Sequence, residues 1–266
     1  MPGGCHGGWW WDSVTEVLAA RGHHVDALTL LGLEDQPDTD RRINLDSHIQ
    51  RVCDAVLAAG TGPDSHRPVV LVAHSYGRLP STAAADRHPD TVPALVLLDA
   101  MLPLDGDSCW SLTDQRQRDW FVAGAARTGN GVDPYASAAP RTRSHPLGSL
   151  LQQVQLTSAW RRVPVRHHVS IPWRGESPLA ASTAHAREDG DLVLNDWPTA
   201  HDVLREGPTR YSPCWRRPTL SWHRHRGLRD FTAPHAALTR RAAPQAVSDR
   251  LLRRKPSIRI RGLLSC

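Results

Sequence analysis

Three residues that could carry out nucleophilic chemistry follow apolar stretches, in the chain order serine, acid, histidine. Ser75 follows the first of these stretches and His201 the last, and the acid between them is Asp99 or Glu176. A serine hydroxyl that gives its proton to an imidazole, which a carboxylate orients, is the arrangement used for acyl transfer. These residues predict a serine nucleophile, a histidine base and a reaction that needs no cofactor.

The stretches before these residues have the pattern of strands in a parallel sheet. The segment 69–73 (VVLVA) is continuous and β-branched, as expected of a strand buried on both faces. We expect strands at 24–30, 69–73, 93–100, 166–171 and 191–197. We expect helices at 11–22, 44–60 and 81–88. Alternating strands and helices predict an α/β fold with a mostly parallel, doubly wound sheet, whose ligands bind beyond the carboxyl ends of the strands.

Two of the expected helices have further signals. Ser13 and Glu16 have the spacing of a capping box at the start of the first helix, and Gly22 follows its end. In the helix 44–60 the apolar residues recur at helical spacing, which predicts one buried face made of Leu45, Ile49, Val52, Cys53 and Val56.

The segment AHSYG, residues 73–77, matches the G-x-S-x-G nucleophile elbow, with Ala73 in the first glycine position. Together with CHGGWWWDSVTEVLAARGHHVDALTLLGL, RHPDTVPALVLLDAMLPLDG and PTAHDV, it resembles the α/β-hydrolase family. The resemblance is to its small methyl esterase and hydroxynitrile lyase branch, bacterial type, and covers roughly residues 2–206. It implies Ser75 as nucleophile and His201 as base. It also implies an oxyanion hole made of the backbone N–H groups of Gly4 and Tyr76.

The chain departs from this family pattern at two places. The family has a strand before the turn at Gly3, whereas this sequence begins at Met1, so we expect the sheet to lack its first central strand. Beyond Glu206 the family continues with an apolar helix, which this sequence does not contain. We therefore expect a hydrolase core over 1–206, with a small helical cap insertion at 102–160, and a basic, loosely ordered extension over 207–266.

The third member of the triad has two candidates. Asp99 ends a strand and is therefore held rigidly, whereas Glu176 lies in the flexible-looking segment RGESP. We favour Asp99. His6 and His74 are interpreted as a turn residue near the oxyanion loop and a packed neighbour of the elbow.

Three function classes follow from these residues. The first is hydrolysis of small carboxylic esters. The second, a hydroxynitrile lyase, would need a lysine near the acid loop, but the only lysine is Lys255. The third is an inactive remnant of the fold or a binding protein.

Composition limits the partners and the compartment. Five widely spaced cysteines without a C-x-x-C pair argue against a disulfide framework and against a zinc site. No stretch approaches the about 18 apolar residues of a membrane span, and no signal peptide is visible at the start, so we expect a cytoplasmic protein. Residues 212–266 hold 13 Lys and Arg against 2 acidic residues, yet no nucleic-acid-binding motif, so we expect no nucleic-acid partner. Nothing in the sequence indicates an oligomeric state.

Overall fold

The computed structural model describes residues 1–37, 42–61, 68–135, 138–173 and 175–205. The chain divides into two units, Met1–Gly207 and Pro208–Cys266, and every described residue belongs to the first unit. The extension expected over 207–266 lies outside the described residues. Within the described ranges, no helix is long and apolar enough to cross a membrane.

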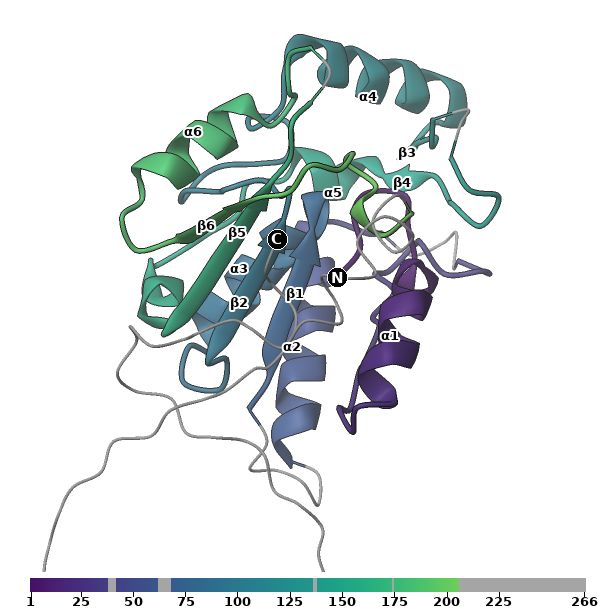
Figure 1. Ribbon diagram of the computed structural model, residues 1–266. Coiled ribbons are helices and arrows are strands. Elements are labelled where there is room, and N and C mark those ends of the chain that lie inside the picture. Colours follow the sequence, from purple (N-terminus) through teal and green to yellow (C-terminus); the bar gives the residue numbers. More distant parts are fainter. Residues whose placement is uncertain (38–41, 62–67, 136–137, 174, 206–266) are drawn as a thin grey trace, which may run out of the picture. The chain divides into compact units, whose positions relative to one another are not determined.

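Four parallel strands form the central sheet, as the alternating sequence pattern predicts (Figure 1). They are β1 (Val70–His74), β2 (Ala94–Leu98), β5 (Val165–Ser170) and β6 (Val193–Asp196), in the order β1-β2-β5-β6. All six residues of β5 are buried, and β2 and β6 pair with it on its two sides. The predicted α/β architecture with a parallel sheet is confirmed.

The strand expected at 24–30 is wrong. This segment has no regular secondary structure, although Leu28 and Leu30 are buried. In the sheet, the position beside β1 is taken by the chain start, where Met1 O accepts the N–H of His74 at 3.0 Å and the Met1 ammonium donates to Val72 O at 2.6 Å. A strand forms only when a neighbour supplies its ladder of hydrogen bonds, and among the described residues no strand lies beside 24–30.

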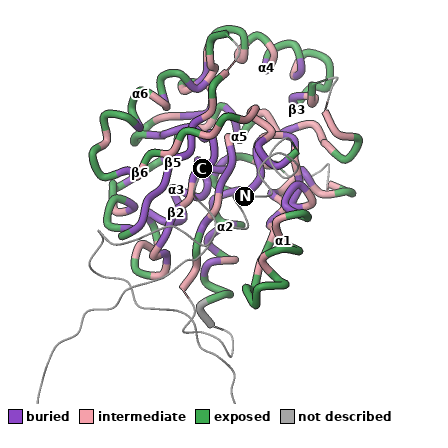
Figure 2. The backbone as a smooth tube through the Cα atoms, viewed as in Figure 1, coloured by how far each residue is buried: buried purple, intermediate pink, exposed green. Residues whose placement is uncertain are grey.

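The helices that flank the sheet are α1 (Asp12–Ala19), α2 (Leu45–Thr61), α3 (Arg78–Arg87) and α6 (Ala180–Glu188). The predicted face of α2 is confirmed, because all five of its named apolar residues are at most 2% exposed. Figure 2 shows this buried face beside the more exposed α1.

The capping box predicted at Ser13 is wrong. Helix α1 continues from the 3-10 turn η1 (Gly8–Trp11), and its N-cap is Trp11, without a side-chain cap. The helix therefore begins before Ser13, so that the Ser13 hydroxyl cannot reach an unpaired N–H of the first turn.

The segment 102–160 contains no strand of the central sheet. It holds α4 (Gln115–Thr128), the two-residue strands β3 (Gly131–Val132) and β4 (His145–Pro146), α5 (Leu147–Leu151) and the start of η3 (Ala159–Arg162). In the view of Figure 1, α4 crosses the top of the molecule with β3 beside it. The N-cap of α4 is Asp114, whose side chain accepts the N–H of Gln117 at 2.8 Å and so caps the helix.

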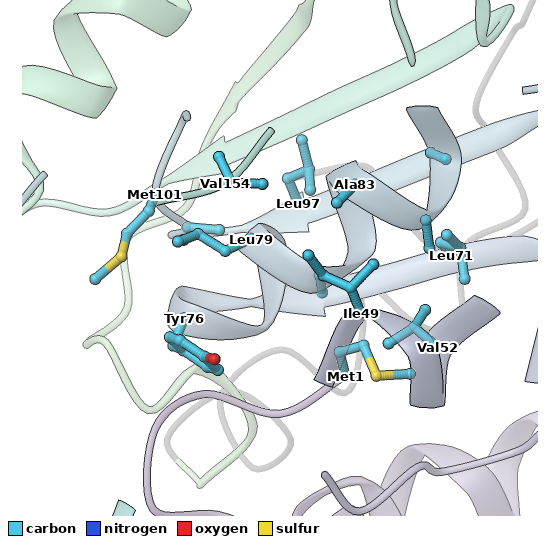
Figure 3. Packing of buried hydrophobic residues seen from close by; sticks show 14 of the residues in the cluster. Met1, Ile49, Val52, Leu71, Tyr76, Leu79, Ala83, Leu97, Met101 and Val154 are labelled. Atoms are coloured by element: carbon cyan, nitrogen blue, oxygen red, sulfur yellow. The ribbon is translucent and has the colours of Figure 1, made fainter. Parts of the chain in front are cut away.

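The main core lies where α2 and α3 pack together and α3 packs on β1 and β2. Ile49 and Val52 of α2 meet Leu79 and Ala83 of α3 in one buried cluster, which Leu97 of β2 extends (Figure 3). This packing fixes the direction of β1 and the start of α3, and therefore the turn that joins them at Ser75.

Candidate active site

Ser75 lies on the tight turn between β1 and α3. Its backbone φ of 50° is in the left-handed region, which a non-glycine residue adopts at a cost. Residues Ser75–Gly77 form the 3-10 turn η2 that leads directly into α3. A Cβ at Gly77 would lie 2.5 Å from Pro2 O, which explains why a glycine stands at the last position of the elbow motif. The turn thus holds a strained serine above the end of β1.

The imidazole of His201 connects Ser75 and Asp99. His201 Nε2 lies 3.1 Å from Ser75 Oγ, and His201 Nδ1 lies 2.6 Å from Asp99 Oδ2. The Asp99 side chain is 2% exposed and that of His201 is 33% exposed. The three residues come from the ends of β1 and β2 and from the loop after β6, all at the carboxyl ends of parallel strands.

The hydrogen-bond partners determine the tautomer of His201. A carboxylate only accepts, so Nδ1–H must be the donor to Asp99. Nε2 then carries a lone pair and faces the Ser75 hydroxyl, which can donate to it. This is the protonation pattern of a general base with its orienting acid.

The other carboxylate candidate, Glu176, is exposed in the loop between β5 and α6. The structure therefore brings Asp99 to His201, and it shows no contact between Glu176 and either Ser75 or His201 among the described residues. Asp99 also has a left-handed backbone, with φ of 38°, and its N–H donates to Val169 O at 2.7 Å. That bond continues the pairing of β2 with β5 and fixes the direction of the carboxylate.

The loop that carries His201 is held by the elbow and by the N-terminal aromatic segment. His74 Nε2–H donates to His201 O at 2.8 Å, and the His74 ring stacks on Trp10 at 4.4 Å. Trp10 Nε1–H donates to Asp202 Oδ1 at 2.9 Å. Burial lowers the pKa of His74 well below its usual value, and the nearby His201 lowers it further, so His74 is a neutral donor.

Of the two residues expected to form the oxyanion hole, Tyr76 directly follows the nucleophile, and Gly4 lies in a turn that passes close to it. A Cβ built on Gly3 would lie 3.0 Å from Ser75 Cβ, so the turn formed by residues 3–6 passes directly over the serine. Gly4 follows in this turn. Tyr76 is the second residue of η2, so its backbone N–H is one of the helix-start donors that have no partner within the helix.

Left-handed non-glycine residues are concentrated at this site. Four such residues occur among the described residues. Cys5 lies in the turn of residues 3–6, which we call the oxyanion turn after its expected role, Ser75 lies in the elbow, Asp99 follows β2 beside His201, and only Ser158 lies elsewhere. Such strain of the backbone persists where the surrounding structure enforces it, most often in functional sites.

Four residues around the site were not found by sequence reasoning. Two of them are tryptophans: Trp173 donates to Asp99, and Trp10 donates to Asp202 in the His201 loop. The other two are histidines: His48 bonds the Tyr76 hydroxyl, and His145 accepts the N–H of Cys5. His48 had a signal that could have been used, since it lies on the apolar face of α2 between Leu45 and Ile49, where a polar residue needs a partner. His145 is one of 15 histidines in an irregular segment and had no such signal.

The described residues contain no group of three or more His, Cys, Asp or Glu side chains that could hold a metal ion. Cys5, Cys53 and Cys109 are free thiols. Burial raises the pKa of the Cys5 thiol to about 12, so this cysteine near the site is not a thiolate nucleophile at neutral pH.

A parallel sheet with a strained serine on the turn after a strand, and with an acid and a histidine at neighbouring strand ends, defines the α/β-hydrolase fold. The sequence resembles Methylesterase 2 of Arabidopsis thaliana, at 36% identity over 101 residues that cover 38% of each chain. It also resembles the carbendazim hydrolyzing esterase of Nocardioides sp. (strain SG-4G), at 33% identity over 41% of this chain and 44% of that protein. The chain thus spans less than half the length of the curated relatives it matches. No family model matches it.

Solved structures cover more of the chain. An extracellular α/β-hydrolase from a Paenibacillus species matches 80% of this chain and 94% of its own, with a TM-score of 0.65 and 17% identity. A mutant of polyneuridine aldehyde esterase matches 80% of this chain and 94% of its own, with a TM-score of 0.59 and 18% identity. The chain therefore has the fold of these α/β-hydrolases, and the sequence relatives that it matches over part of their length are named as esterases.

Proposed function

We propose that this protein hydrolyses carboxylic esters of small molecules with Ser75 as nucleophile, His201 as general base and Asp99 as the orienting acid. The observation that carries the proposal is the single imidazole that lies within hydrogen-bond distance of both the serine and a buried carboxylate.

The reaction would proceed in two acyl transfers. Ser75 Oγ attacks the ester carbonyl while its proton passes to His201 Nε2, and the C=O electrons move to the carbonyl oxygen. The tetrahedral intermediate collapses, and His201 returns the proton to the departing alcohol. A water then repeats the sequence on the acyl-enzyme and releases the acid. In both steps the negative oxygen would be held by the N–H groups of Gly4 and Tyr76.

The names of the sequence relatives indicate which substrates to test first. One is named a methylesterase and another a carbendazim hydrolyzing esterase, so methyl esters and activated small esters come first. A hydroxynitrile lyase reaction has less support, since the only lysine, Lys255, lies outside the described residues. The remaining candidate is an inactive or binding member of the fold.

The deciding experiment uses the purified full chain, a chromogenic acetyl ester and a fluorophosphonate probe. We expect turnover of the ester and covalent labelling of one residue, Ser75, identified by mass spectrometry. Ser75→Ala should remove both, while Ser111→Ala, a hydroxyl deletion in the cap segment, should keep both. Labelling that persists in Ser75→Ala would refute the assignment of the nucleophile. A folded chain with neither turnover nor labelling would favour the inactive member of the fold.

A further inference from the structure

Two buried histidines lie under the residues of the oxyanion hole. His145 is 1% exposed and His48 is not exposed, and their rings meet edge to face at a centroid distance of 5.8 Å. The ring of Tyr76 packs against His145 at 4.5 Å. The triad does not use either histidine, so their burial needs another explanation.

His145 holds the oxyanion turn through the backbone of Cys5. The Cys5 N–H can only donate, so His145 Nδ1, 3.1 Å away, must be the acceptor. His145 Nε2 therefore carries the proton, which it donates to Ser149 Oγ at 3.0 Å, and the Ser149 hydroxyl donates to Pro146 O at 2.8 Å. The direction of each of these three hydrogen bonds is therefore determined, because the Cys5 N–H at one end can only donate and Pro146 O at the other end can only accept.

The peptide between Gly4 and Cys5 is held at both of its polar atoms. Its N–H donates to His145, and its carbonyl, Gly4 O, accepts from His6 Nδ1–H at 2.7 Å. Cys5 itself is left-handed, with φ of 64°, a conformation that a free turn would leave. Two imidazoles thus fix the peptide plane that follows Gly4. The preceding peptide carries the Gly4 N–H, and its carbonyl, Gly3 O, accepts the backbone N–H of His6 at 3.4 Å. The turn therefore holds the peptides on both sides of Gly4, and with them the direction of the Gly4 N–H.

His48 holds the second oxyanion residue in the same way. Leu31 O can only accept, so His48 Nε2, 2.9 Å away, carries the proton. His48 Nδ1 then accepts the Tyr76 hydroxyl proton at 2.7 Å. This bond anchors the side chain of Tyr76, which directly follows Ser75 in the nucleophile turn.

We propose that His145 and His48 are positioning residues that set the two N–H donors of the oxyanion hole, Gly4 and Tyr76, in the direction of the developing negative charge. The inference rests on the proposed ester hydrolysis. Each histidine must be neutral, with one ring nitrogen as donor and the other as acceptor. Burial lowers the pKa of His48 to about 4, and burial with His48 nearby lowers that of His145 well below its usual value, so both meet this requirement at neutral pH.

The test compares His145→Leu, which has no acceptor for the Cys5 N–H, with His145→Asn, whose Oδ1 can replace Nδ1. His23→Leu removes an exposed histidine and is the matched control. Each variant is assayed for kcat and KM on a chromogenic ester. Each is also titrated with a trifluoromethyl ketone, to which Ser75 Oγ adds while its proton passes to His201 and the ketone oxygen becomes an anion in the oxyanion hole.

We expect His145→Leu to lower kcat about 100-fold with little change in KM, because a small misplacement of an oxyanion donor has that effect. The ketone's inhibition constant should weaken by the same factor, since only the tetrahedral adduct uses the hole. His145→Asn should recover most of both losses. His23→Leu should match the unmutated protein.

Other outcomes overturn the inference. The positioning role is refuted if folded His145→Leu keeps its kcat, or if its kcat falls while the ketone inhibition constant is unchanged. Either result leaves the proposed function intact. An unmutated chain with no Ser75 labelling and no turnover removes both. If His145→Leu does not fold, Tyr76→Phe tests the inference instead, because it deletes only the hydroxyl that bonds His48 and keeps the packing of the ring. Equal losses in kcat and in ketone affinity would support the positioning role of His48. Unchanged values would overturn it.

Discussion

Trp173 and His201 donate hydrogen bonds to the same oxygen of Asp99. Trp173 Nε1 lies 3.1 Å from Asp99 Oδ2, and His201 Nδ1 lies 2.6 Å from it. The indole ring also contacts the imidazole ring, with centroids 5.0 Å apart. The carboxylate therefore cannot rotate without losing two bonds at once, which fixes the plane in which it holds His201.

The first prediction separates the two carboxylates. Asp99→Asn should lower kcat by a factor approaching 10⁴, the loss known when a serine protease loses this acid, because the amide favours the wrong tautomer of the histidine. KM should change little, since the imidazolium forms only during the reaction. Glu176→Gln, an exposed loop change of the same chemistry, is the control and should stay within about twofold. Steady-state kinetics of both variants give the comparison.

Two results would alter this assignment, and one would support it. A large loss of kcat in Glu176→Gln with only a small loss in Asp99→Asn would reverse the ranking of the two acids and leave the hydrolase proposal in place. Equal activity of both variants, with Ser75→Ala inactive, would mean that the site works as a Ser-His dyad. A smaller but clear loss in Trp173→Phe would show that the second donor to Asp99 contributes.

The second prediction concerns the approach of the oxyanion turn to the nucleophile. A Cβ at Gly3 would lie 2.9 Å from His74 Nδ1, closer than real Cβ contacts come, and 3.0 Å from Ser75 Cβ, where one of the two groups would have to shift. Gly3→Ala should therefore push the turn away from Ser75 and lower kcat by about 100-fold, at a stability cost of about 1–3 kcal/mol. Gly190→Ala, whose Cβ would meet nothing within 4 Å, is the control. A fully active Gly3→Ala would contradict the described turn.

The sequence could predict those parts of the molecule that depend on local pattern. The buried face of α2 follows from helical spacing, and the strand ends that carry Ser75 and His201 follow from runs of apolar residues before them. The position of Asp99 at the end of a strand likewise follows from the apolar run that precedes it.

The remaining features depend on contacts between distant residues. The segment 24–30 has the composition of a strand, but a strand also needs a neighbour, and composition does not say whether one is present. The anchors of the oxyanion turn join Cys5 to His145 across 140 residues, and Tyr76 to His48 across the packing of α2 on α3. No pattern within a window of sequence encodes such pairs.

The third prediction uses a buried arginine. Arg78 is not exposed, its Nη1 lies 3.2 Å from His168 Nδ1, and its Nε and Nη2 have no hydrogen-bond partner among the described residues. Burial lowers the pKa of Arg78 to about 9. The nearby charge of Asp189 raises this pKa, and the charges of Arg161 and Arg166 lower it further.

Replacing a buried ion pair by apolar side chains of similar volume is often neutral or stabilises a protein by about 1–4 kcal/mol, because the charges no longer have to be desolvated. The same desolvation cost applies to the incompletely paired guanidinium of Arg78. Arg78→Met should therefore raise the free energy of unfolding in urea, whereas Arg78→Lys, which keeps the charge, should lower it. A large loss of stability in Arg78→Met would show that the guanidinium makes bonds that outweigh its desolvation.

The last prediction is the dependence of stability on pH. Burial lowers the pKa of five histidines in the folded protein. The pKa of His48 falls to about 4 and that of His168 to about 3, those of His74 and His145 fall well below the usual value, and that of His6 is also lowered. Unfolding returns each to about 6.5. Between these values the unfolded chain binds protons that the folded chain does not, so the stability is fully present above about pH 6.5 and is lost as the pH falls toward the folded pKa.

Each such histidine should reduce the free energy of unfolding by up to about 1.4 kcal/mol per pH unit below pH 6.5. Urea unfolding at pH 7.5, 6.5 and 5.5 should therefore show a smaller fall between the two higher pH values, where each unfolded histidine becomes half protonated, and a steeper fall between the two lower ones. His168→Gln, which keeps a neutral polar side chain beside Arg78, should reduce the slope by about one proton. A flat profile down to pH 5 would mean that these histidines are hydrated or charged in the folded protein. It would also remove the neutral acceptors on which the positioning of Gly4 and Tyr76 depends.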